Sequence, residues 1–190
     1  MLAQFFDPSF VRGVTYVSLF LLVAPLFPFV YLVLRWRAGE QRDIRGLGTY
    51  GALLYFRTVA LLLAVAGAAN LTYGMVSTTP VDEALTRLSW GLFTGSLVFL
   101  AINLGLGRLV ELGDAAGDAR RMFGGFLMVL AGLVAGFVLV LFFITVFEKV
   151  DHSAKEAVEM HADTMKLYGC WVAYYLGVYI VTTVFLTRRA

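Results

Sequence analysis

The sequence predicts an all-α integral membrane protein, a single transmembrane domain built as a bundle of five transmembrane helices. Its 190 residues are 60% hydrophobic and only 15% charged, whereas soluble domains have about 45–50% apolar and about 25% charged residues. The apolar residues also occur in uninterrupted runs that can cross a hydrocarbon core of about 30 Å as helices of roughly 20 residues. Strands of a membrane barrel are much shorter and alternate apolar with polar residues, so these runs indicate helices.

Five runs have the required length, and we expect transmembrane helices near residues 14–34, 53–73, 88–106, 122–147 and 168–186. The first run could be taken for a cleaved signal peptide. Arg12 is the only positive residue before it, however, the run is too long, and no small-residue cleavage site follows. We therefore expect it to remain as a span, kinked by Pro25 and Pro28.

Three polar side chains are expected within the second and third spans or at their edges, namely Arg57, Asn70 and Asn103. Arg57 is the one charged residue in a span, and its long side chain is expected to reach the cytoplasmic headgroups. Asn103 should lie at a similar depth, so a hydrogen bond between the two could join these spans. Asn70 either makes interhelical hydrogen bonds or lines a water-filled vestibule, and we favour the hydrogen bonds.

Glycines four residues apart mark the third and fourth spans. The segment GLFTG places Gly91 and Gly95 on one helical face, and GLVAG does the same for Gly132 and Gly136. Small residues at this spacing let two helices approach closely in a membrane. The pattern is common in membrane proteins, and it predicts tight packing against a helix of this chain or of another chain.

The connection after the fourth span, residues 148–167, carries both histidines and the densest group of carboxylates. It contains no proline or glycine, and its apolar and acidic residues fall on different helical faces, which predicts a short amphipathic helix on the outer side. Glu148, His152 and Glu156 follow one another at intervals of four residues and are candidate ligands for a divalent cation. The alternative, which we favour, is a solvated face balanced by lysines.

Basic residues divide unevenly between the two sides of the predicted bundle. The side with the first connection, the third connection and the C-terminus holds ten of the 15 lysines and arginines. The positive-inside rule places this side in the cytoplasm, so we expect a multi-pass protein of a cytoplasmic (inner) membrane with its N-terminus outside and its C-terminus inside. In the first connection, candidate contacts to anionic lipids or to a cytoplasmic partner are Arg35, Arg37, Arg42 and Arg45. The positive-inside rule alone would also explain why these arginines lie in a cytoplasmic connection, without any specific contact.

The sequence argues against several kinds of site. No Asp, Glu or His lies in a predicted span, which disfavours a proton-relay transporter and a haem held between spans by two histidines. Cys170 is the only cysteine, so an intrachain disulfide and a cysteine-rich metal site are excluded. Neither the GxGxxG nor the GxxxxGK[ST] spacing occurs. We expect no cofactor and no nucleic-acid partner.

These absences, together with the glycine faces, predict a non-catalytic integral membrane subunit of a larger membrane protein complex, which contributes helix packing and an outer docking helix. Its expected partners are membrane lipids and either other membrane-protein subunits or further copies of itself. The alternative is a small homo-oligomeric channel or transporter whose acidic outer cap concentrates cations. A membrane enzyme that uses His152 or His161 is a third, less favoured interpretation.

Overall fold

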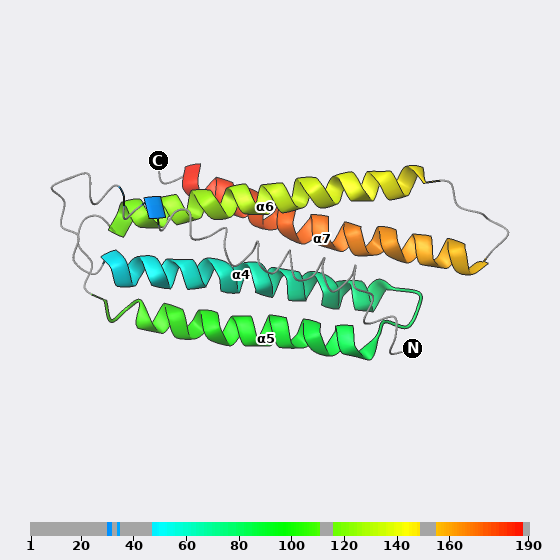
Figure 1. The fold of residues 1–190 in the computed structure, drawn as a ribbon, viewed down its shortest axis with the longest axis horizontal. Coiled ribbons are helices and arrows are strands. Elements are labelled where there is room, and N and C mark those ends of the chain that lie inside the picture. The colour runs from blue at the N-terminus through cyan, green and yellow to red at the C-terminus, as the bar shows by residue number, and fades with distance from the viewer. Residues whose placement is uncertain (1–29, 32–33, 35–46, 111–115, 149–154, 188–190) are drawn as a thin grey trace.

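The described part of the structure is a bundle of four long helices (Figure 1). The computed structural model describes residues 30–31, 34, 47–110, 116–148 and 155–187. All regular structure in these ranges is helical, and the long helices are α4 (Leu47–Val76), α5 (Glu83–Leu106), α6 (Ala116–Phe147) and α7 (Lys155–Thr187). Each is long and apolar enough to cross a membrane. The predicted all-α class is confirmed for this part of the chain.

Four of the five predicted spans correspond to these helices. The first predicted span, near residues 14–34, lies outside the described residues except at positions 30, 31 and 34, which are helical. The predicted count of five is therefore not matched by the four long helices that the structure describes.

The helices extend beyond the apolar runs from which they were predicted. α4 begins at Leu47 rather than near residue 53. α5 begins at Glu83, and the carboxylate of Asp82 accepts a hydrogen bond from the N–H of Ala84 at 2.7 Å. Such a cap satisfies a backbone donor that the first helical turn leaves without a partner. Hydropathy measures only the apolar run, so it does not detect polar turns of this kind.

The predicted separate outer helix is wrong where the structure describes it. α6 ends at Phe147, and α7 then runs for 33 residues from Lys155, so residues 155–167 are the first turns of the helix that also holds the fifth predicted span. Gly169, between the predicted outer helix and the apolar run, lies inside α7. A glycine costs a helix only about 1 kcal/mol, which the good helix formers on either side of it offset.

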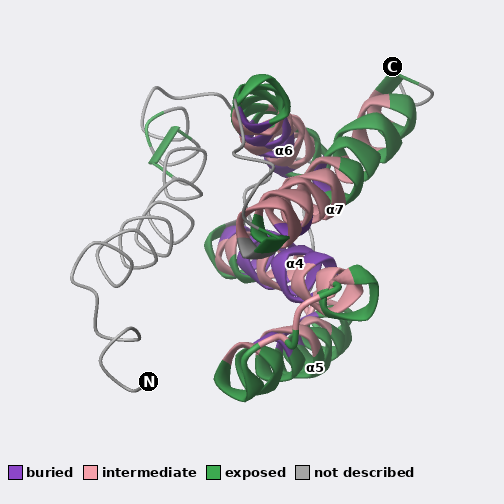
Figure 2. Cartoon of the chain, turned by 90° about the vertical axis from the view of Figure 1, so that its right-hand side faces the viewer, coloured by how far each residue is buried: buried purple, intermediate pink, exposed green. Residues whose placement is uncertain are grey.

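Helix α4 lies at the centre of the described bundle (Figure 2). It packs against α5 on one side and against α6 and α7 on the other, while α6 and α7 pair with each other. Buried residues concentrate along α4, whereas few residues of α5, α6 and α7 are buried, and many of their apolar side chains are exposed. This exposure is expected of helices that face lipid, because lipid tails are as apolar as the side chains themselves.

Two apolar clusters hold α4 to α6 and α7. The first lies in the middle of the bundle and consists of Leu62, Val65, Leu130, Ala131, Ala135 and Tyr175. The second lies near the start of α4 and of α6 and consists of Tyr50, Leu54, Ala119 and Phe123. Leu62 and Tyr175 are also joined by a hydrogen bond of 3.3 Å from the tyrosine hydroxyl to the leucine carbonyl.

The contact between α4 and α5 depends on a different glycine from those that the sequence pattern marked. A Cβ atom on Gly67 would lie 2.7 Å from the backbone nitrogen of Phe93 and 2.9 Å from the carbonyl oxygen of Ser89. Both distances are shorter than real Cβ contacts, so the two backbones can approach this closely only because residue 67 has no side chain.

Candidate functional site

A cluster of polar residues joins α7 to the connection between α4 and α5. Both oxygens of the Asp163 carboxylate accept backbone hydrogen bonds, Oδ1 from the N–H of Thr78 and Oδ2 from that of Thr79, each at 2.9 Å. The hydroxyls of Ser77, Thr78 and Thr79 also donate to it, at 3.0, 2.8 and 2.5 Å. Asp163 is only 3% exposed. One carboxylate therefore fixes the path of three consecutive residues.

Lys166 completes this cluster from one turn further along α7. Its ammonium lies 3.0 Å from Oδ1 of Asp163, so each carboxylate oxygen has three donors around it. An ionised carboxylate offers about four lone-pair sites, and all of them are taken. Asp163 is consequently a structural anchor here rather than a free ligand or a general base. The sequence marked it only as a member of an acidic face.

Other polar groups of the bundle also form hydrogen bonds, either between helices or within one helix. The indole nitrogen of Trp171 donates to Oδ1 of Asn70 at 2.8 Å, and the hydroxyls of Thr72 and Tyr174 lie 2.8 Å apart. The hydroxyl of Thr145 donates to the carbonyl of Leu141 in its own helix. Asn70 thus makes the interhelical hydrogen bond that the sequence analysis favoured over a water-lined vestibule.

Arg57 contacts the C-terminal end of α5. Its Nη2 donates to the carbonyl oxygen of Asn103 at 2.8 Å, whereas the Asn103 amide donates to Phe99 in its own helix. The expected pairing of Arg57 with Asn103 is present, but the acceptor is the backbone. A cation near the last carbonyls of a helix is favourable, because the helix dipole is negative there.

Gly107 leaves the space that the Arg57 side chain occupies. A Cβ atom on Gly107 would overlap Nη2 of Arg57. The sequence analysis did not single out Gly107, and only its place directly after the end of the third span could have drawn attention to it. Nε of Arg57 is buried and has no hydrogen-bond partner among the described residues.

A second arginine approaches the same region from α6. Nε of Arg120 donates to the hydroxyl of Tyr50 at 3.0 Å. The guanidinium carbons of Arg57 and Arg120 lie 5.9 and 6.0 Å from the centre of the Tyr50 ring, within the range of a cation–π interaction. Tyr50 is 1% exposed, so both guanidinium groups lie beside one buried aromatic ring.

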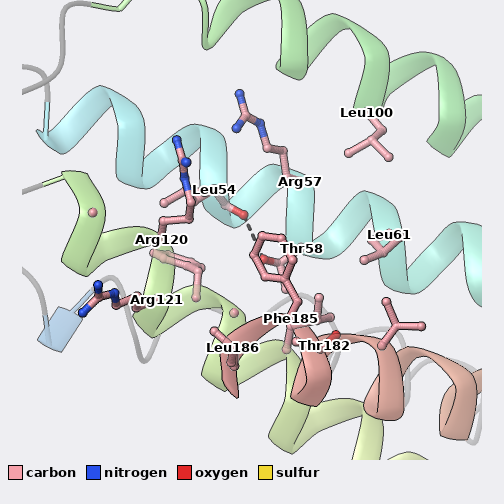
Figure 3. Close-up of a pocket in the computed structure, with 15 residues that line it drawn as sticks. Leu54, Arg57, Thr58, Leu61, Leu100, Arg120, Arg121, Thr182, Phe185 and Leu186 are labelled. Atoms are coloured by element: carbon pink, nitrogen blue, oxygen red, sulfur yellow. Dashed lines mark hydrogen bonds between the residues drawn. The ribbon is translucent and has the colours of Figure 1, made fainter. Parts of the chain in front are cut away.

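These arginines line a cavity of about 760 Å³ between the helices. In Figure 3 the side chains of Arg57 and Arg120 extend in the same direction, while Arg121 points away from them. The other lining residues are mainly apolar and come from all four long helices, namely Leu54, Thr58, Leu61, Leu100, Gly117, Phe123, Gly124, Leu127, Val181, Thr182, Phe185 and Leu186. The cavity therefore combines cationic groups with an extended apolar wall.

The four glycines that the sequence marked have different surroundings. A Cβ atom on Gly132 would lie 3.1 Å from the ring of Tyr179, which indicates close packing of α6 on α7. Cβ atoms on Gly91, Gly95 and Gly136 would meet nothing within 4 Å among the described residues. The close packing expected of these three is therefore not made within the described bundle.

The remaining candidates lie partly or wholly outside the described residues. Glu148 is described and exposed, but His152 is not described, and only the backbone of Glu156 is. The four arginines of the first connection, Arg35, Arg37, Arg42 and Arg45, are not described either. In the part of the chain that the structure describes, no three His, Cys, Asp or Glu side chains are grouped closely enough to hold a metal ion. The candidate cation site stays a prediction.

Comparisons of this chain with protein-family models, with curated proteins and with solved structures found no match. The function is therefore argued from the geometry of the chain.

Proposed function

We propose that this chain is a non-catalytic subunit of a larger membrane protein complex and that α5 is the helix that meets a partner subunit. The observation that carries this proposal is the one-sided packing of α5. Its buried residues are Ser89, Ser96 and Asn103, each seven residues after the last. Residues at this spacing form a single narrow stripe, and this stripe faces α4, the helix against which α5 mainly packs.

The opposite face of α5 has the features of a second helix contact. Successive residues turn by about 100° around a helix, so Gly91 and Val98 lie across the helix from the buried stripe. Gly95 and Ile102 lie about 100° from it, on its exposed flank. Val98 and Ile102 are 61% and 53% exposed. Each glycine costs a helix about 1 kcal/mol relative to alanine. Close approach of a partner helix to this pair of glycines would offset that cost.

A substitution on this face tests the proposal. Leucine in place of Gly95 is expected to leave the chain folded, because the position is open, and to lower recovery of partner polypeptides about tenfold by keeping the helices apart. The measurement is native mass spectrometry of the protein purified gently from its own membrane. Gly177→Leu, at an open position on α7, is the matched control and should keep the partners.

Each result of this experiment decides between the competing functions. Different polypeptides at fixed stoichiometry, lost in Gly95→Leu but kept in Gly177→Leu, support the subunit function. A homo-oligomer without other polypeptides contradicts it and favours the channel or transporter, for which ion flux through reconstituted vesicles is the next measurement.

We also propose the number of spans and the orientation of the chain in the membrane. We take the run near residues 14–34 as a fifth span, with the N-terminus outside and the C-terminus in the cytoplasm of an inner membrane. The clustering of Arg57, Arg120 and Arg121 around one cavity supports this orientation, because the positive-inside rule assigns such an end to the cytoplasm.

Labelling of a single cysteine tests this orientation. In a Cys170→Ala background, Asp43→Cys is expected to react with a membrane-impermeant maleimide only after the membrane is opened. Glu83→Cys, at the exposed start of α5 on the side that would lie outside, is the control and should react in intact cells. Labelling of position 43 from outside, with position 83 protected, reverses the proposed orientation.

A further inference from the structure

We infer that the cavity between the helices binds an anionic phospholipid, whose phosphate contacts Arg57 and Arg120 and whose acyl chain lies along the apolar wall. This inference does not depend on the proposed subunit function, because it concerns the isolated chain. It also involves different residues from the arginines of the first connection. Charge, geometry and shape each support it.

Among the described residues, no carboxylate balances the charge of the cavity. Arg57, Arg120 and Arg121 line it, and within the ranges that the structure describes no carboxylate forms an ion pair with any of them. A cation at membrane depth is costly unless a counter-charge or hydrogen-bond acceptors reach it. Nε of Arg57 is buried and has no hydrogen-bond partner among the described residues, so the hydrogen bonds of this guanidinium are incomplete there.

The two guanidinium groups are held in place before any ligand arrives. Nη2 of Arg57 is fixed by the Asn103 carbonyl at 2.8 Å, and Nε of Arg120 is fixed by the Tyr50 hydroxyl at 3.0 Å. Each guanidinium has further N–H groups left, and their planar arrangement matches two oxygens of a phosphate. Groups that are already ordered lose little entropy on binding.

The apolar wall selects a lipid over a soluble anion. Leu61, Leu127 and Phe185 contribute apolar surface from α4, α6 and α7. The cavity volume of about 760 Å³ lies within the range of about 300–1,000 Å³ that is usual for ligand sites. Inorganic phosphate would leave this wall without contacts, whereas an acyl chain covers it. A basic site between transmembrane helices is also a known arrangement for anionic headgroups.

Native mass spectrometry in a neutral detergent tests the inference on the purified full-length chain. Phosphatidylglycerol and phosphatidylcholine with the same acyl chains are titrated separately. One phosphatidylglycerol is expected to bind about tenfold more tightly than phosphatidylcholine, because the choline cation would face the arginines. Arg120→Gln is expected to remove this preference. Arg108→Gln is the matched control, because Arg108 is an exposed arginine close to Gly107 that does not line the cavity.

The remaining outcomes contradict the inference. Equal binding of the two lipids, or equal losses in Arg120→Gln and Arg108→Gln, indicates general surface attraction rather than a site. Displacement of phosphatidylglycerol by millimolar inorganic phosphate indicates an anion site that does not use the apolar wall. The melting temperature of Arg120→Gln is measured alongside. Should that variant unfold, Leu61→Gln, which keeps both arginines and changes the wall, takes its place and is expected to weaken phosphatidylglycerol binding.

Discussion

Replacing Asp163 with asparagine is expected to lower the melting temperature of the purified protein by about 5–10 °C. The substitution keeps the size of the side chain but removes its charge and turns one of the two acceptor oxygens into an NH₂ donor. Three donors surround each of those oxygens. The new NH₂ group therefore points at hydrogen-bond donors and cannot accept from them. The N–H of Thr78 or of Thr79 loses its acceptor. Thermal unfolding in detergent measures the effect.

Glu159 provides the control for this prediction. It lies one turn before Asp163 on α7 and forms only a 3.6 Å ion pair with the exposed Lys155. Exposed pairs contribute little to stability, so Glu159→Gln should change the melting temperature by no more than about 2 °C. A second readout is proteolysis of the connection between α4 and α5, which Asp163→Asn should accelerate. If the two variants melt alike, Asp163 is not the anchor described here.

The four helices could be predicted because long apolar runs in a membrane protein have few alternatives to helix. Their ends could not, because polar turns such as that at Asp82 continue a helix without adding hydropathy. The continuity of α7 was missed for a related reason. The amphipathic segment and the apolar run differ in composition and were predicted as separate elements, but both favour helix, and the single glycine between them weakens it only slightly.

Contacts between polar side chains could be predicted from the sequence only where two residues on consecutive spans lie at a similar depth in the membrane. Arg57 and Asn103 lie at a similar depth on consecutive spans, so their contact could be anticipated, although not the use of the backbone carbonyl. The bond between Arg120 and Tyr50 joins residues 70 positions apart and has no signal in the pattern of either helix. The sequence indicates how deep a residue lies along its span and what charge it carries. It does not indicate how each helix is rotated about its own axis, which determines the neighbour that a side chain faces.

The glycine pattern failed to identify the closest helix contact for the same reason. Gly91 and Gly95 have the expected spacing, yet an added Cβ on either would meet nothing within 4 Å among the described residues, while Gly67 forms the contact. A weaker signal was present, since Ala60 and Ala64 precede Gly67 at intervals of four and three residues and both are buried. The spacing of small residues identifies a helical face that a second helix could approach closely. Several helices of this bundle have such a face, and only the folded structure shows which one makes the contact.

Gly67→Ala is expected to reduce the free energy of unfolding by about 1–3 kcal/mol, the usual cost of adding a methyl group where a core has no room. The added Cβ would meet backbone atoms of Phe93 and Ser89, and a backbone cannot turn aside as a side chain can. Helix α5 must then move away from α4. Unfolding in mixed micelles of increasing SDS content, followed by tryptophan fluorescence, measures the loss.

Gly177→Ala separates this steric effect from the general effect of replacing a helical glycine. Gly177 also lies within a helix, but its added Cβ would meet nothing within 4 Å among the described residues. Alanine there removes the entropic cost of glycine and should raise stability by roughly 0.5–1 kcal/mol. The two substitutions make the same chemical change and are expected to have opposite signs. If Gly67→Ala also stabilises the protein, the backbones of α4 and α5 are not in contact at this position. Since α5 is attached to the described bundle mainly through α4, its exposed glycine face would then no longer be fixed relative to the rest of the chain.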